Sequence, residues 1–226
     1  KQLNILNRWQ YTDAEKGWVS FASIRWMQDD KQIGAVQFEP DRDKNSTSIW
    51  GSEISTSRLD GSLKIGYVFP EIPYQSFGFQ SAYSNHKQES YYGFRRYVID
   101  QESFYANLLF NSIIGNTKNK FKVGLNFSFD QYLETVDTFF FDRSDRSVGS
   151  FFEYSYDNLE NFSFVGGVRI DFHNRLGNFV TPRFHLRYLP REKTILRASV
   201  GSGRKAANIF AENQTLFGTN RLISIE

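Results

Sequence analysis

Alternation of apolar and polar side chains, repeated over segment after segment, is the feature that most constrains the fold of this chain. One stretch carries apolar side chains on every second position, at Phe121, Val123, Leu125, Phe127 and Phe129. Another carries them at Phe162, Phe164, Val168, Ile170 and Phe172. A period of two indicates a β-strand with one apolar and one polar face. Strands this aromatic and this numerous predict a wall that faces lipid on one side and water or polar protein on the other.

The composition argues against a helical membrane protein and is compatible with a wall of strands. Aromatic residues make up 17% of the 226 residues, so a large apolar surface must be covered, yet 23% of the residues are charged. A membrane-spanning helix needs about 20 consecutive apolar residues. The longest uncharged run near the middle of the chain, residues 103–117, is shorter than this and contains Asn. In a barrel wall apolar and polar side chains alternate, so the hydropathy averaged over a sequence window stays low.

Charge and cysteine content limit the partners of the chain. The net charge is +2, so we expect no strongly polyanionic partner and no nucleic acid. Cysteine is absent, which excludes disulfides and thiolate metal sites. Residues 1–10 lack the apolar segment of a signal peptide, so we expect this chain to be a mature or internal piece if the protein is exported.

Ten strands are predicted, and each has the roughly 9–11 residues that a tilted transmembrane strand needs. They cover Leu3–Tyr11, Trp18–Gln28, Ser55–Phe69, Gln75–Lys87, Glu102–Ile114, Lys120–Leu133, Val148–Tyr156, Phe162–His173, Phe179–Leu189 and Thr194–Gly203. Short turns are predicted at Thr12–Lys16, Glu71–Tyr74, Gly115–Asn119, Asn158–Glu160 and Pro190–Lys193. Longer loops are predicted between them, at Glu39–Ser52, Gln88–Gln101, Glu134–Ser147, Asn174–Asn178 and from Ala206 onward. A membrane barrel has short turns on one rim and longer loops on the other, and the sequence follows this order.

A soluble β-sandwich or propeller is the competing interpretation of the same strands. Sandwich strands are usually shorter, about five or six residues, and their long connections do not gather at one end so regularly. No repeat with the length of a propeller blade is visible. Strand length and the order of the connections therefore favour the membrane wall.

The polar face of the last three predicted strands is basic, and its arginines are candidate lumenal residues: Arg169, Arg183, Arg187 and Arg197. A simple hairpin register around residues 190–193 places Arg187 near Arg197. Two neighbouring cations need an anion, which something filling the lumen of a closed barrel would supply. The alternative is a hydrated pore lining, in which water and salt screen the charges. We favour the filled lumen.

The predicted loop Gln88–Gln101 is a candidate ligand-binding segment. It carries aromatic and arginine side chains, the usual contact residues of binding surfaces: Tyr91, Tyr92, Phe94, Arg95, Arg96 and Tyr97. The alternative is an aromatic girdle at the height of the lipid headgroups. For the tyrosine-rich segment the two interpretations remain open, whereas for Phe139–Phe141 the girdle is favoured.

Signals for catalysis and cofactor binding are weak, so we expect no enzyme activity, no cofactor and no metal. The histidines His86, His173 and His185 are far apart in the sequence and lack metal-ligand spacing. No Gly-Xaa-Ser-Xaa-Gly elbow is present. The motif Gly201-Ser202-Gly203 lacks the Lys-Ser/Thr ending of a phosphate loop, and we interpret it as a pair of strand glycines.

The last third of the chain resembles a known family of membrane proteins. The stretches concerned are TPRFHLRYLP at 181–190, TILRASVGSGR at 194–204 and ANIFAEN at 207–213. They resemble the barrel of TonB-dependent outer-membrane receptors, in which a PR-x-x-x-x-Y-x-P strand descends to a tight periplasmic turn and an LR-x-S-x-G-x-G-R strand climbs to a long loop. The match is specific over about Phe179–Asn213, and the remainder matches only in its alternating strands, short turns and long loops.

The resemblance implies a fold, a location and a function. It implies an all-β, antiparallel up-and-down transmembrane β-barrel of 22 strands in the outer membrane of a Gram-negative cell. An N-terminal plug domain folds inside such a barrel. It also implies import of a scarce ligand, such as a siderophore, cobalamin, a glycan or a peptide, with energy passed from the inner membrane through TonB. Outer-membrane lipid, the plug and TonB are the implied partners, and a surface lipoprotein is a further candidate.

The chain departs from the family pattern in its extent. Residues 1–226 have room for about ten strands, with no plug, no TonB-contacting segment and no final strand ending in an aromatic residue. We therefore expect them to form part of one barrel domain, cut from the middle of a longer protein, with Glu226 in or just beyond an extracellular loop. Two alternatives remain: a self-contained ten-strand barrel, such as an adhesin or surface protease, and a soluble all-β binding module.

Overall fold

The computed structural model describes residues 1–44, 46 and 48–218, so Glu226 lies outside the described residues. Its strands are β1 (Gln2–Asp13), β2 (Trp18–Gly34), β3 (Gly51–Val68), β4 (Ser76–Tyr92), β5 (Arg95–Ile114), β6 (Asn116–Val136), β7 (Phe139–Asp157), β8 (Phe162–His173), β9 (Gly177–Arg191) and β10 (Thr194–Gly201). Three short helical segments accompany them: α1 (Pro40–Asp43), α2 (Ile209–Glu212) and the 3-10 helix η1 (Gln214–Gly218). None of the helices within the described ranges has the length and apolar character needed to cross a membrane.

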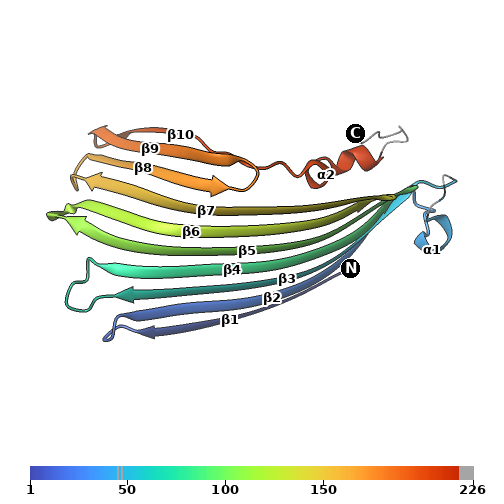
Figure 1. The fold of residues 1–226 in the computed structure, drawn as a ribbon, viewed down its shortest axis with the longest axis horizontal. Coiled ribbons are helices and arrows are strands. Elements are labelled where there is room, and N and C mark those ends of the chain that lie inside the picture. Colours follow the sequence, from blue (N-terminus) through green and yellow to red (C-terminus); the bar gives the residue numbers. More distant parts are fainter. Residues whose placement is uncertain (45, 47, 219–226) are drawn as a thin grey trace.

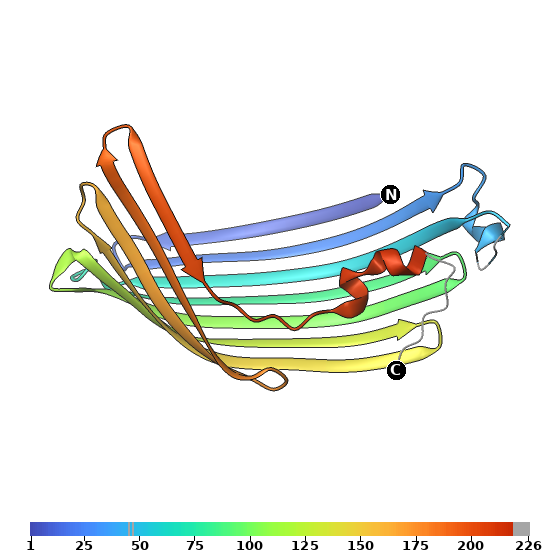
Figure 2. The same cartoon turned by 90° about the horizontal axis from the view of Figure 1, so that it is seen from above.

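The strands form one sheet in which each strand pairs antiparallel with the next in the chain (Figure 1). The predicted ten-strand, up-and-down order is therefore confirmed. The sheet curves like a trough, and α2 lies on its concave side (Figure 2). Within the part of the chain that the structure describes, β1 and β10 do not pair, so the ring that a self-contained ten-strand barrel requires is not closed.

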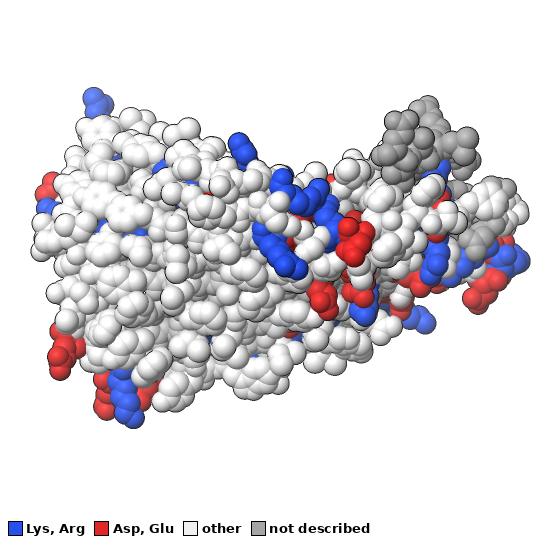
Figure 3. Space-filling model, in the orientation of Figure 1, with Lys and Arg blue, Asp and Glu red and all other residues white. Residues whose placement is uncertain are grey.

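Strand register separates the side chains into two faces of opposite character. On the convex face Leu125 is opposite Leu108, and the two side chains are 58% and 47% exposed. Ile170 is also exposed, and Phe127 and Phe164 are partly exposed. The convex face is turned to the viewer in Figure 3, where charged side chains gather toward the ends and leave a broad uncharged area between them. A soluble sandwich would cover this face with a second sheet, but the described strands form one sheet only.

A chain of aromatic contacts follows the convex face near the short turns. Neighbouring ring centroids lie between 4.8 and 6.4 Å apart across six strands, through Trp18, Tyr67, Phe69, Phe77, Phe110, Phe121 and Phe152. Rings such as these have an apolar body and concentrate where lipid meets the polar interface. The continuous row of rings is therefore typical of an aromatic girdle at this rim.

Short turns lie at one end of the sheet as predicted, although β6 already begins at Asn116, inside the predicted turn Gly115–Asn119. Two of the predicted long loops are wrong. The ranges 88–101 and 134–147 continue as paired strands, joined by two-residue turns at Gly93–Phe94 and Asp137–Thr138. Gly93 and Asp137 have φ angles of +63° and +54°, which such tight turns need. Charged residues on the outer ends of these strands resemble loop sequence because both strand faces there can carry polar side chains.

Candidate functional site

The concave face of the sheet is the polar face and holds all four predicted lumenal arginines. Register places Arg169 opposite Thr181, Arg183 opposite Gly167, and Arg187 opposite both Ser163 and Arg197. Residues opposite one another in a ladder project from the same face. The four guanidinium groups therefore share one region of β8–β10, as the sequence predicts.

Two of these arginines are neutralised by carboxylates of the sheet itself. The Nη2 atom of Arg169 lies 2.7 Å from Oδ1 of Asp171, a side chain that is almost fully buried. Arg183 pairs with Glu153 of β7, two strands away, and Lys122 also contacts that carboxylate at 3.3 Å. Burial of the carboxylates strengthens both pairs, because less water screens them.

Arg187 and Arg197 differ from this pattern. They are register partners on β9 and β10, so the predicted proximity is confirmed. A hollow of about 290 Å³ lies over them, lined also by His185 and Ser199. Among the described residues no carboxylate forms an ion pair with either arginine. Like charges directly opposite one another destabilise a ladder, so this pair leaves an excess positive charge on the concave face.

The predicted ligand-binding residues do not form one surface. Tyr91 and Arg96 are opposite one another on one face of the β4–β5 hairpin, whereas Tyr92 and Tyr97 project to the other face with Arg95. Phe94 lies in the turn and is 61% exposed. The single-loop prediction is therefore wrong in its geometry, because strand alternation divides the six residues.

On the convex side of this hairpin, Glu89 organises the charged groups. Tyr91 donates a hydrogen bond to Oε1 of Glu89 at 2.8 Å, and Arg96 donates to the same oxygen at 2.9 Å. The Tyr91 hydrogen bond, followed by that of Arg96, lowers the pKa of the Glu89 carboxyl below its usual value. Lys44 lies 4.3 Å from the centre of the Tyr91 ring. This polar group lies beyond the apolar area of the convex face.

On the concave side, Tyr97 lies in a buried aromatic cluster. This aromatic cluster comprises Tyr92, Tyr97, Phe141, Phe210 and Phe217. Tyr97 is fully buried and stacks on Phe217, with ring centroids 5.1 Å apart. Tyr92 stacks on the same ring at 5.7 Å, and Phe141 contacts Phe210 at 5.0 Å. The predicted girdle role is therefore wrong for Phe141, which packs on the concave side.

A buried hydrogen bond fixes the base of the aromatic cluster. The hydroxyl of Tyr97 donates to Oε1 of Glu134 at 2.7 Å, and the Glu134 side chain is only 4% exposed. Burial, with this carboxylate beside it, raises the pKa of the Tyr97 hydroxyl. Sequence reasoning missed Glu134, Phe210 and Phe217, because no local pattern connects residues so far apart in the chain.

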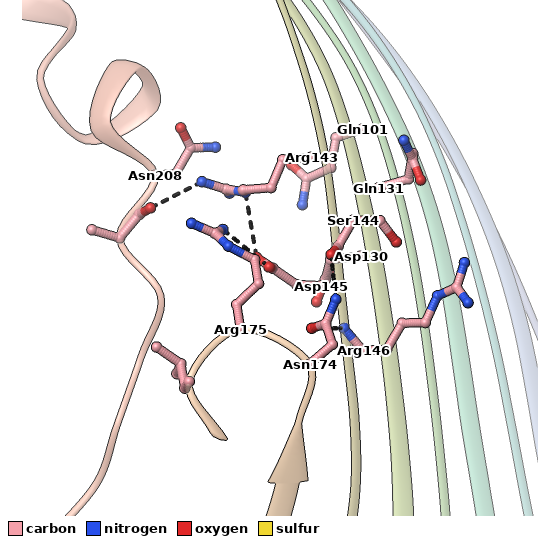
Figure 4. A network of polar contacts seen from close by, with 12 residues as sticks. Gln101, Asp130, Gln131, Arg143, Ser144, Asp145, Arg146, Asn174, Arg175 and Asn208 are labelled. Carbon is pink, nitrogen blue, oxygen red and sulfur yellow. Dashed lines mark hydrogen bonds and ion pairs between the residues drawn. The ribbon is translucent and has the colours of Figure 1, made fainter. Parts of the chain in front are cut away.

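A polar network next to the aromatic cluster joins three separate parts of the chain (Figure 4). Arg143 of β7 donates from Nη1 to the carbonyl oxygen of Ala207 at 3.0 Å. Its Nε atom lies 3.3 Å from Asp145, and its guanidinium group lies 4.1 Å from the ring centre of Tyr132. Arg175, in the β8–β9 turn, also pairs with Asp145 at 3.1 Å. The network therefore holds the segment after β10 and the β8–β9 turn against β7.

The described residues contain no group of three or more His, Asp or Glu side chains that could hold a metal ion. The histidines are distributed over β4, β8 and β9. The arrangement on the concave face is one of paired charges and packed rings, which can bind and position a polar or aromatic partner.

Comparison with known proteins gives one clear match. The family model described as TonB dependent receptor-like, beta-barrel matches residues 3–221, nearly the whole chain. No curated protein sequence matches the chain.

Proposed function

The chain belongs to the family of TonB-dependent receptor β-barrels, and we propose that it forms part of the wall of an outer-membrane receptor that imports a scarce ligand with energy supplied through TonB. One observation supports the wall most strongly: ten consecutive strands combine an exposed apolar convex face with a charged concave face. A barrel wall between hydrocarbon and an enclosed interior requires this division. The candidate cargo classes are siderophores, cobalamin, glycans and peptides, and the proposed role has no catalytic step.

We propose that β1 and β10 pair with further strands of the same barrel domain. Each has one free ladder edge among the described residues. An unpaired edge leaves N–H and C=O groups without partners, which hydrocarbon does not tolerate. The convex face would then contact outer-membrane lipid around a closed ring.

The proposed interior partner is a plug domain of the same protein. Arg187 and Arg197 have no carboxylate of the described wall to neutralise them, although Arg169 and Arg183 do. Carboxylates of a plug in the lumen would supply the missing negative charge. We propose that TonB acts on the protein through a plug-associated region outside this sequence, and that a surface lipoprotein is a candidate partner at the outer end.

The first contact with cargo is proposed at the tip of the β4–β5 hairpin. Phe94 is exposed there and Tyr91 and Arg96 lie just below it, whereas Tyr92 and Tyr97 are covered. An exposed aromatic ring beside a guanidinium group is a common contact for ligands.

The test of the plug-holding role is a pair of substitutions in the full-length protein. Arg187→Ala with Arg197→Ala should loosen the plug and raise the entry of a large antibiotic that the intact outer membrane excludes. The matched control is Arg191→Ala with Lys193→Ala, which removes two positive charges from the exposed turn of the same hairpin. Unchanged entry in the first variant would contradict the plug-holding role.

The test of energised import is uptake by cells with and without TonB. Growth on each candidate cargo class should depend on the receptor and should stop when TonB is deleted. Uptake that requires the receptor but continues without TonB would refute the proposed energy source while leaving the wall intact.

A further inference from the structure

The segment that follows β10 crosses the concave side of the sheet as a strap, which we define as residues 202–218. Figure 2 shows it leaving the sheet at the end of β10 and carrying α2 back over the hollow of the trough. It has no regular structure before α2 begins at Ile209. Gly201 and Gly203 flank its first residue, and glycine allows a wide range of backbone angles. The strap therefore begins at a point where the chain can bend.

Two aromatic rings of the strap, Phe210 and Phe217, pack against side chains of the sheet. Phe217 is 3% exposed and stacks on both Tyr92 and Tyr97, with interplanar angles of 29° and 23°. Phe210 contacts Phe141 at an interplanar angle of 46°. Contacts between rings involve no backbone hydrogen bonds. The two rings can therefore leave the sheet together without breaking any.

The polar contacts of the strap are largely internal. The side chain of Asn208 accepts a hydrogen bond from the backbone N–H of Ala211, and Lys205 pairs with Glu212 at 2.6 Å. Three hydrogen bonds between described residues join the strap to the strands: the N–H of Ser202 to the carbonyl oxygen of Pro182 at 3.1 Å, Arg143 to Ala207, and the Tyr92 hydroxyl to Gln214 at 3.3 Å. Arg204 also lies 5.4 Å from the ring centre of Phe179.

The polar side chains beneath the strap also have partners within the strands. Tyr97 keeps its hydrogen bond to Glu134 without any strap residue, and Arg143 keeps Asp145 and the Tyr132 ring. Lifting the strap would therefore leave few buried polar groups without partners on either side. Opening of the strap therefore costs chiefly the burial of the Phe210 and Phe217 rings and of the rings beneath them.

The docked strap also covers part of the arginine-containing concave face of β8–β10. A hollow of about 360 Å³ lies between Ser202–Arg204 of the strap and Arg169, Asp171 and Thr181 of the sheet. The strap therefore lies directly over this part of the concave face.

We propose that the strap is a latch that swings about Gly201–Gly203 and must release its aromatic rings from the β4–β7 wall before cargo can pass. The docked state covers Tyr92, Tyr97 and Phe141, and the released state exposes them to the interior. The gating part of this proposal depends on the proposed function as an importer, whereas the opening of the latch does not.

The opening is tested first, in cells that carry the full-length protein and without any cargo. Val136 belongs to the cluster under Phe217 and is 2% exposed, whereas Val36 in the β2–β3 connection is 99% exposed. Val136→Cys should react completely with a membrane-impermeant maleimide, more slowly than Val36→Cys. Phe217→Leu, which keeps an apolar side chain but removes the stacked ring, should accelerate the reaction of Val136→Cys. A Val136→Cys variant that stays unlabelled after Val36→Cys has fully reacted overturns the latch.

The gating is tested by locking the strap. This chain contains no native cysteine, so Arg143→Cys and Ala207→Cys can be joined by a bismaleimide that contains a cleavable disulfide. Uptake should fall to the level of cells without the receptor and return on reduction. The matched control pair is Lys87→Cys with Asp100→Cys, register partners outside the strap whose side chains lie 3.1 Å apart. Equal uptake by the locked and reduced forms overturns the gating role, and absence of uptake in every form, the native receptor included, refutes the importer instead.

Discussion

A positive charge on the convex face should destabilise the protein according to its depth in the bilayer, and Leu125 is the position where the effect should be largest. Leu125 lies on β6 midway between Phe121 and Phe129, and it is 58% exposed. Its opposite residue, Leu108, is also exposed and offers no carboxylate to pair with a new cation. We therefore expect Leu125→Arg to place an unpaired guanidinium group near the middle of the hydrocarbon.

The magnitude follows from comparison with Leu133, on the same face of the same strand. The positions differ by eight residues, which at about 3.3 Å per residue is about 26 Å along the strand. With a strand tilt of about 40°, this is about 20 Å along the membrane normal, which places Leu133 at or beyond the interface. Arginine costs about 2–4 kcal/mol at the midplane and about 0–1 kcal/mol near the interface. A difference of about 2–3 kcal/mol corresponds to a factor of roughly 30–140 in the unfolding equilibrium.

The assay is reversible denaturant unfolding of the full-length protein in lipid vesicles, with Leu133→Arg as the matched control. Leu125→Arg should lower the unfolding free energy by about 2–3 kcal/mol more than Leu133→Arg does. If both substitutions leave stability unchanged, the convex face is in contact with water rather than lipid. If both destabilise equally and strongly, a packed protein layer covers the face. Either result would refute the reasoning.

Three further predictions concern single contacts. Tyr97→Phe leaves the buried Glu134 carboxylate without its donor and should cost about 1–3 kcal/mol in urea unfolding. Gly124→Ala would place a Cβ 2.5 Å from a backbone oxygen and from the Phe151 ring, so it should destabilise by about 1–3 kcal/mol, whereas Gly61→Ala meets no atom within 4 Å and should be near neutral. Because the pKa of Glu89 is lowered on folding, its contribution should be present above the unfolded value of about 4.3 and lost as pH falls through the folded value. At its exposed site the loss should be below about 1 kcal/mol, seen as a smaller change in urea midpoint between pH 7 and pH 3 in Glu89→Gln.

The wall can be predicted from the sequence because lipid favours apolar side chains and the lumen favours polar ones, so adjacent residues of a strand differ in polarity. In β6 the odd positions from Phe121 to Phe129 are apolar without exception, so both the strand and its face are fixed locally. In the hairpin of β9 and β10 a two-residue connection pairs Thr194 with Arg191, and a register shift between Thr194 and Leu196 then moves the pairing by one residue. Arg187 and Arg197 therefore lie opposite one another as predicted.

Contacts that cross a strand or return from a distant segment could not be predicted. Arg183 reaches Glu153 of β7 across β8, at a position where β8 has Gly167 between them in the ladder. A Cβ at Gly167 would lie 3.6 Å from Cγ of Arg183, an ordinary van der Waals contact, so the reach does not require glycine there. The burial of Tyr97 depends on Phe217, whose position follows from the path of the strap and not from any periodicity.

The error over the two long loops points to a physical boundary along the strands. In β5 the apolar side chains face outward at Phe104, Leu108 and Phe110, but Tyr97 and Ile99 face inward, so the apolar face changes sides. In β6 the same change occurs between Phe129, which faces outward, and the inward Val136. Phe104 is the register partner of Phe129, and Tyr97 is the partner of Val136, so both strands change at the same height.

A change of apolar face at one height in adjacent strands is expected where the solvent outside the wall changes. Below this height hydrocarbon favours apolar side chains on the convex face, and above it water favours charged ones such as Glu89 and Arg96. The apolar residues above it must then be covered from inside, and Phe210 and Phe217 supply that cover. The strap therefore covers the concave face at this height, because the inward side chains of Tyr97 and Val136 are apolar there.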